Sequence, residues 1–160
     1  MNLLNRPIDG GLKLGGRRLF GENKNWRGPV FYVVFGTAFA ALIHFTIAGQ
    51  LWVSSAYDLD PLKVGLATTS AYASAELLNS FVKRRLGIEP GQSPKSRVGA
   101  FIQAFFDNLD GALASGLVLY FCFGAPPLEL LLALGMSFLI HASTDVWMRA
   151  LGLKKTLKKK

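Results

Sequence analysis

The apolar residues of this chain gather into four long runs, separated by short basic or turn-forming stretches. A helix needs about 20 predominantly apolar residues to cross a hydrocarbon core of about 30 Å. The pattern therefore predicts an all-α fold, an integral membrane bundle of about four transmembrane helices in a single domain, 1–160. The predicted spans are 29–53, 61–82, 105–123 and 128–147.

Two of these runs carry further structural signals. The second run is rich in Ala, Ser and Thr, which allow close helix packing in a membrane. The stretch Gly-Ala-Pro-Pro at 124–127 is typical of a tight turn. We therefore expect the third and fourth spans to form an antiparallel hairpin.

The basic residues orient the predicted spans. They gather before the first run, between the second and third, and after the fourth, whereas only Lys63 falls on the other side. By the positive-inside rule, both termini are expected to be cytoplasmic in a multi-pass protein of the cell inner (cytoplasmic) membrane. The predicted cytoplasmic parts are a basic, glycine-rich segment at 1–28, a loop at 83–104 and a basic tail at 148–160. The first thirty residues lack the apolar stretch of a secretory leader.

The net charge of +8 has two interpretations. Nucleic-acid binding needs a soluble basic face with groove-reading or aromatic elements, and the chain shows none of these, so we expect no nucleic-acid partner. Attraction to anionic lipid headgroups or to a phosphate-rich substrate fits the pattern better.

The second run contains a carboxylate, Glu76, on the same helical face as Asn79 and Lys83. A carboxylate inside a transmembrane segment is costly, and its default interpretation is a functional group that faces the bundle interior. The alternative is a residue close enough to the cytoplasmic end to be hydrated.

A second acidic feature, Asp107 and Asp110, stands at the entry to the third run, with its members three residues apart on one helical face. Two neighbouring carboxylates repel each other, and Mg²⁺, which prefers oxygen ligands, would relieve that repulsion. The alternative is an N-terminal cap with a favourable helix-dipole carboxylate.

A basic cluster at 83–85 leaves the membrane where the aspartate pair enters it. The glycine-rich segment adds exposed amides and basic side chains that can wrap a polyphosphate, although it contains no Walker motif. Acidic metal ligands beside Lys and Arg are typical of phosphoryl or nucleotidyl transfer. We therefore predict an enzyme of that class.

Three ordered motifs resemble one family of membrane enzymes. They are PIDGGLKLGGRRLFGENKNWRG in the N-terminal segment, ELLNSFVKRRLGIEPG at 76–91, and DNLDGAL at 107–113. Together they resemble the CDP-archaeol synthases, membrane cytidylyltransferases that are distantly related to the phosphatidate cytidylyltransferases. The sequence departs from the family pattern at Asn25, where threonine is common, and at Asn79, where distant relatives have glutamate.

The resemblance implies a reaction of CTP with a membrane glycerolipid phosphate, archaeol-type or similar to phosphatidic acid, to give a CDP-lipid and pyrophosphate with Mg²⁺ as cofactor. It also implies a role for individual residues. Lys83 and Arg84 would be catalytic and hold phosphates. The positions that would bind the triphosphate or the lipid phosphate are Arg17, Lys24 and Arg27, and those that would bind metal are Glu76, Asp107 and Asp110.

Two alternatives remain at this stage. A CDP-alcohol phosphotransferase would also have paired aspartates, but its arginine and second aspartate pair are absent from the sequence that follows Asp110. A non-enzymatic small membrane protein or transporter would explain the runs and the basic rim, but not the acidic residues beside them. The sequence leaves a homodimer open.

Overall fold

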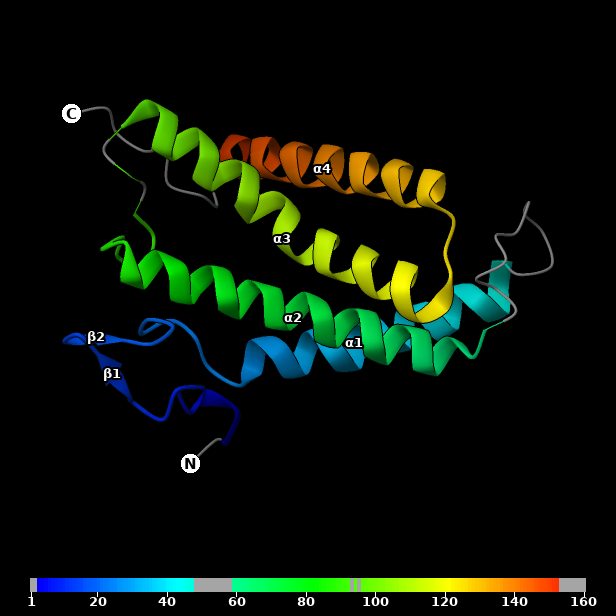
Figure 1. Cartoon of the computed structure of the whole chain (residues 1–160), viewed down its shortest axis with the longest axis horizontal. Coiled ribbons are helices and arrows are strands. Elements are labelled where there is room, and N and C mark those ends of the chain that lie inside the picture. Colours follow the sequence, from blue (N-terminus) through cyan, green and yellow to red (C-terminus); the bar gives the residue numbers. More distant parts are fainter. Residues whose placement is uncertain (1–2, 48–58, 93, 95, 153–160) are drawn as a thin grey trace.

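Four long helices dominate the computed structural model, which describes residues 3–47, 59–92, 94 and 96–152 (Figure 1). The helices are α1 (Arg27–Ile47), α2 (Pro61–Arg85), α3 (Arg97–Phe123) and α4 (Pro127–Ala150). A short 3-10 helix, η1 (Leu3–Asn5), and two short strands, β1 (Lys13–Leu14) and β2 (Arg17–Arg18), precede them. The predominantly helical fold predicted from the apolar runs is confirmed.

Helix-capping residues set two of the boundaries. At the start of α2, the Asp60 carboxylate accepts from the N–H of Leu62 at 2.9 Å, and Pro61 follows it. At the start of α3, the Ser96 hydroxyl accepts from the N–H of Gly99 at 2.9 Å. Both side chains satisfy amides that have no partner within the first helical turn.

The stretch predicted as the cytoplasmic loop, 83–104, is helical at both of its ends. Helix α2 continues to Arg85 and α3 already begins at Arg97, so only 86–96 connects them. The predicted border at 105 followed the polarity of the chain, but Ser96 caps the helix earlier and no proline interrupts the residues that follow it. The predicted end of the first span and the residues 153–160 of the predicted tail lie outside the described residues.

The helices pack side by side in chain order, with α2 between α1 and α3, and with α4 against α3 (Figure 1). The predicted tight turn between α3 and α4 is confirmed, because Gly124 ends α3 in the left-handed conformation (φ 68°). The N–H groups of Gly124 and Ala125 each bond back to carbonyls of the last helical turn at 3.1 Å.

The apolar side chains of this structure face outward. Among the described residues, Ala73 and Ala125 are the buried apolar residues, whereas Phe45 is 78% exposed and Phe121 is 76% exposed. Soluble proteins rarely expose so much contiguous apolar surface, and lipid is the solvent that suits it. By length and composition, α1 over Arg27–Thr46 and α4 over Pro127–Met148 can each cross a membrane.

Small residues bring α1 and α2 close together. A Cβ added at Gly65 would lie 2.9 Å from the Thr37 Cα, and one added at Gly36 would lie 2.4 Å from a Thr69 methyl carbon. The sequence predicted such packing for α2 from its Ala and Ser content, whereas the closest approach is at the glycines. Because α1 and α2 pack closely in antiparallel directions, the start of α1 lies beside the end of α2 (Figure 1).

The N-terminal segment, residues 3–26, folds back on itself beside the end of α2. Strands β1 and β2 form an antiparallel hairpin, with a turn of Gly15 and Gly16 that both have positive φ. Farther out, the Trp26 N–H donates to the Arg6 carbonyl and the Ile8 N–H to the Lys24 carbonyl, each at 3.2 Å. These bonds close the segment into a loop whose end places Lys24 next to α2.

Candidate active site at the basic end of the helices

Asp9 organises the N-terminal segment. Its buried carboxylate accepts hydrogen bonds from the Arg18 guanidinium at 2.5 Å, the Gly11 N–H at 2.9 Å and the Phe20 N–H at 3.5 Å. Burial by itself raises the pKa of a carboxyl group, but these hydrogen bonds and the Arg18 charge outweigh it, so the pKa of Asp9 lies below its usual value. Asp9 is therefore a charged anchor of the loop.

Replacing Asp9 by asparagine is expected to loosen this loop at neutral pH. A carboxyl group with a lowered folded-state pKa stabilises the fold above its unfolded pKa of about 3.9, and the effect is lost as the pH falls through the folded value. Amide hydrogen exchange over 9–20 should therefore be faster in D9N than in the wild type at pH 7, and the difference should shrink below about pH 4. The variant E22Q, in the same segment, serves as the control, and equal protection in D9N and wild type at pH 7 would contradict the prediction.

Arginines join the N-terminal segment to α2. The Arg85 guanidinium donates to the carbonyls of Leu14, of Arg17 at 3.3 Å and of Arg18 at 3.0 Å. In return, the Arg17 guanidinium donates to the Arg84 carbonyl at 3.3 Å. The segment is thereby held against the end of α2.

Arg84 lies beneath the N-terminal segment. It is buried, it donates to the Ile88 carbonyl, and its Nε has no hydrogen-bond partner among the described residues. A Cβ added at Gly21 would lie 3.2 Å from that Nε. The phosphate-binding role of Arg84 stays a prediction, because in this structure its guanidinium bonds to the Ile88 carbonyl, just beyond the end of α2.

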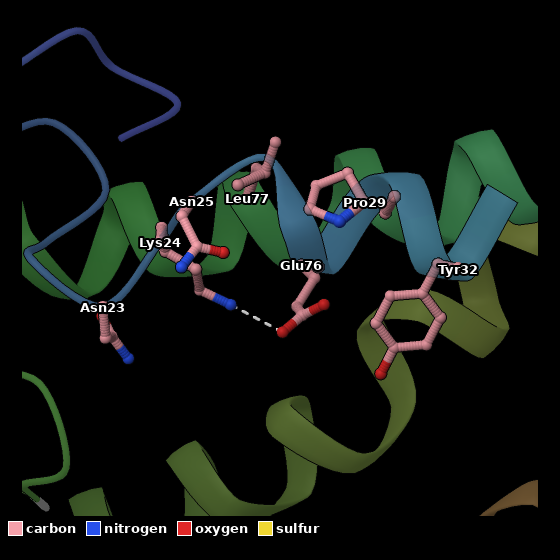
Figure 2. A pocket seen from close by; sticks show the side chains of 9 residues that line it. Asn23, Lys24, Asn25, Pro29, Tyr32, Glu76 and Leu77 are labelled. Carbon is pink, nitrogen blue, oxygen red and sulfur yellow. Dashed lines mark hydrogen bonds and ion pairs between the residues drawn. The ribbon is translucent and has the colours of Figure 1, made fainter. Parts of the chain in front are cut away.

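A pocket of about 190 Å³ opens where the N-terminal segment meets α1 and α2. The Lys24 Nζ points to the Glu76 carboxylate across it, at 2.6 Å, and the Tyr32 ring lies on the other side of Glu76 (Figure 2). Its lining residues are Asn23, Lys24, Asn25, Gly28, Pro29, Tyr32, Ala73, Glu76 and Leu77. The pocket thus combines an ammonium group, a carboxylate and two carboxamides at the end of the helices.

The aspartate pair lies on α3 and faces polar residues of α2. The Asn79 Nδ2 donates to Asp107 Oδ1 at 2.8 Å and to Asp110 Oδ2 at 2.6 Å. The Lys83 Nζ lies 2.5 Å from Asp107 Oδ1, and the Gln103 amide donates to Asp107 Oδ2 at 3.5 Å. We call Asn79, Lys83, Asp107 and Asp110 the aspartate cluster.

The alternative interpretation of the aspartates as helix caps is wrong. Helix α3 begins at Arg97, so Asp107 and Asp110 lie well inside it and its N-terminal amides are far from them. Favourable interaction with a helix N-terminus is confined to the first turn. The carboxylates are stabilised instead by side chains of α2, Asn79 and Lys83.

The structure brings two of the three predicted metal ligands together. Asp107 and Asp110 bond to one amide nitrogen, and a pair of carboxylates is the kind of donor set that suits Mg²⁺, which otherwise keeps waters and substrate phosphates as ligands. Glu76 pairs with Lys24 instead. Within the described ranges, no group of three or more His, Cys, Asp or Glu residues stands at metal-binding spacing.

The predicted phosphate-binding residues divide into two groups. Lys24 and Lys83 carry amino groups at the pocket and at the aspartate cluster, respectively. Arg27 lies at the start of α1 with its guanidinium 5.6 Å from the Phe31 ring centre, and Arg17 bonds to the end of α2.

Sequence reasoning missed the bridging role of Asn79, which it noted as a member of the Glu76 and Lys83 helical face and as a departure from the family pattern. The signal was present, because Asn79 shares a helical face with Glu76 and Lys83.

Comparison with known proteins supports the family resemblance indicated by the three sequence motifs. The model of the CarS-like family, described as CDP-archaeol synthase, matches residues 4–157. This chain belongs to the CarS-like CDP-archaeol synthase family. The resemblance predicted from the sequence is thereby confirmed, as are an enzyme of the nucleotidyltransferase class and its membrane character.

Several curated relatives carry the same name. The CDP-archaeol synthase of Halorubrum lacusprofundi is 31% identical over 157 residues, which cover 93% of this chain and 82% of the relative. That of Methanococcus aeolicus is 27% identical, over 92% and 80% of the two chains, and that of Staphylothermus marinus is 32% identical, over 88% and 72%. No solved structure matches this CarS-like chain significantly.

Proposed function

We propose that this chain is a CTP-dependent cytidylyltransferase that converts an archaeol-type glycerolipid phosphate into a CDP-lipid and releases pyrophosphate. The observation that carries the proposal is the aspartate cluster, in which two carboxylates and the Lys83 ammonium group meet at the basic end of otherwise apolar helices. The reaction needs anionic metal ligands and cations for phosphate at one place. Membership of the CarS-like family supports this choice over a phosphotransferase or a transporter.

Mg²⁺ fits this site as a cofactor. Asp107 and Asp110 would hold it, and it would supply positive charge to the triphosphate, as metal ions do in related phosphoryl chemistry. The third predicted ligand, Glu76, pairs with Lys24 in the structure, and its contribution to metal binding remains part of the proposal.

The basic residues of the site would bind the phosphates. Lys24 and Lys83 both hold carboxylates in the structure, so each amino group can exchange a carboxylate for a phosphate oxygen without losing a charged partner. A lipid phosphate oxygen would attack the α-phosphorus of CTP while the bond to pyrophosphate breaks. No covalent intermediate with the protein is needed.

We also propose that all four helices cross the bilayer, with both termini and the aspartate cluster on the cytoplasmic side. Helix α2 ends and α3 begins at the end of the molecule that carries the N-terminal segment (Figure 1). The clusters of basic residues flank these ends, in agreement with the positive-inside rule. A lipid substrate would then reach the site from the surrounding bilayer with its apolar chains still in hydrocarbon.

The proposal is tested with the purified chain in detergent, with Mg²⁺, one labelled nucleotide triphosphate at a time, and two lipid phosphates. We expect a labelled CDP-lipid and pyrophosphate from CTP, and more product from an isoprenoid-ether glycerol phosphate than from phosphatidic acid. Preference for phosphatidic acid would correct the lipid, and preference for another nucleotide would correct the base. No product from any pair by a folded protein would overturn the proposed reaction.

A further inference from the structure

Asn79 is the one side chain that hydrogen-bonds to both aspartates in the described part of the chain. Its Nδ2 carries two hydrogens, and these go to Asp107 at 2.8 Å and to Asp110 at 2.6 Å. The bonds also cross from α2 to α3. A single carboxamide therefore links the two carboxylates to each other and ties both to the neighbouring helix.

The electrostatics of the aspartate cluster explain why a carboxamide suits this place. Lys83 lies against Asp107, so the cluster has two carboxyl groups for one amino group. Two carboxylates this near to each other repel, and a donor shared between them offsets part of that repulsion without adding charge. A second lysine would do the same more strongly, but it would also repel a divalent cation.

The amide oxygen of Asn79 leaves the carboxamide free to turn over. Among the described residues, the Asn79 Oδ1 accepts no hydrogen bond, so turning the carboxamide over breaks only the two bonds to the aspartates. Amide nitrogen and oxygen exchange places in such a turn, and the oxygen is a ligand type that Mg²⁺ accepts. A cation between the aspartates would replace the hydrogens that held them.

We propose that Asn79 is a positioning residue for the metal site, holding Asp107 and Asp110 together with its amide nitrogen and turning its amide oxygen toward the cation when Mg²⁺ binds. This inference rests on the proposed function, because it takes the aspartate pair as the metal site. It assigns to the asparagine a role that its contacts with both carboxylates support.

Two substitutions separate the roles of Asn79. Asn79→Leu removes both the donor and the acceptor at similar size, and Asn79→Asp keeps an oxygen ligand but removes the donor. The matched control is Asn108→Leu, because Asn108 neighbours Asp107 in sequence but makes no hydrogen bond to it. Each variant is made in the full chain and its fold is checked by circular dichroism.

The measurement is the binding of Mn²⁺ alone, as a spectroscopic substitute for Mg²⁺, followed by electron paramagnetic resonance of the purified protein without nucleotide. We expect N79L to weaken Mn²⁺ binding about 10- to 100-fold, as is typical when a residue that orients metal ligands is lost. We expect N79D to bind Mn²⁺ at least as tightly as the wild type, and to gain more thermal stability from it. N108L should bind Mn²⁺ as the wild type does.

Unchanged Mn²⁺ affinity in N79L would overturn the inference, and weaker binding by N79D than by the wild type would overturn the turning of the carboxamide. Failure of the proposed function shows differently. In that case the wild type makes no CDP-lipid in the activity assay, whatever its affinity for Mn²⁺. The wild type could also make CDP-lipid and yet show no Mn²⁺ binding that is lost in Asp107→Ala. That result would overturn the inference and leave the proposed reaction standing.

Discussion

Asp107→Ala is expected to reduce CDP-lipid formation by on the order of 10³-fold, since loss of one group that stabilises developing charge costs about 10²- to 10³-fold and this change also frees a lysine. The Asp107 carboxylate forms an ion pair with Lys83 and accepts hydrogen bonds from Asn79 and Gln103. Its removal leaves the Lys83 ammonium group without its carboxylate and the proposed metal site with one carboxylate. The measurement is the initial rate with labelled CTP at saturating Mg²⁺.

The control for this variant is Glu129→Ala. Glu129 is an exposed acidic residue in the first turn of α4, away from the aspartate cluster, and its loss changes the net charge by the same amount. Its rate should stay within about twofold of the wild type, because isolated surface charges contribute little. A rate above about a tenth of wild type in D107A would contradict the role of Asp107, given the loss of about 10²- to 10³-fold expected for such a group.

Gly111→Ala is expected to lower the thermal stability of the protein by several degrees and to reduce activity with it. A Cβ at position 111 would lie 2.3 Å from a carbon of the Tyr72 ring, and two further ring atoms are within 2.7 Å. The Tyr72 ring lies tilted against the Tyr32 ring, with the ring centres 4.9 Å apart, and this contact restricts its movement away from position 111. Overpacking of this kind costs about 1–3 kcal/mol, and it would push α3 and its neighbouring Asp110 away from α2.

Gly116→Ala is the matched control in the same helix. A Cβ at position 116 meets nothing within 4 Å, so only the helix propensity changes, and alanine is better than glycine by about 1 kcal/mol. G116A should melt at the wild-type temperature or above it, as followed by circular dichroism in detergent. Equal melting temperatures for G111A and G116A would show that the Tyr72 ring moves without cost, contrary to the prediction.

The apolar runs and the turn signals were sufficient to predict the helices. The runs predicted four segments, and a helix covers the described part of each, because a long apolar stretch carries its signal in consecutive residues. The turn at Gly124 was also predicted from consecutive residues, the Gly-Ala-Pro-Pro stretch at 124–127. The start of α3 was not, because Ser96 begins the helix in a stretch whose polarity indicated a loop.

The sequence also predicted the chemical groups of the site but not their partners. Asp107, Asp110, Lys83 and Glu76 were all identified from residue type and helical spacing, which are local properties. The partnership of Glu76 with Lys24 depends on how the N-terminal segment folds over α2, a contact between residues 52 positions apart.

By itself, the sequence of this protein determined four helices, their apolar character, the basic ends and the family to which the chain belongs. Only the tertiary structure decided that Asn79 bridges the two aspartates, that Arg84 lies under the N-terminal segment, and that Gly111 makes room for Tyr72. The physical reason is that apolar periodicity and caps act within a few turns of chain. Which side chains meet depends instead on the faces that the helices turn toward one another.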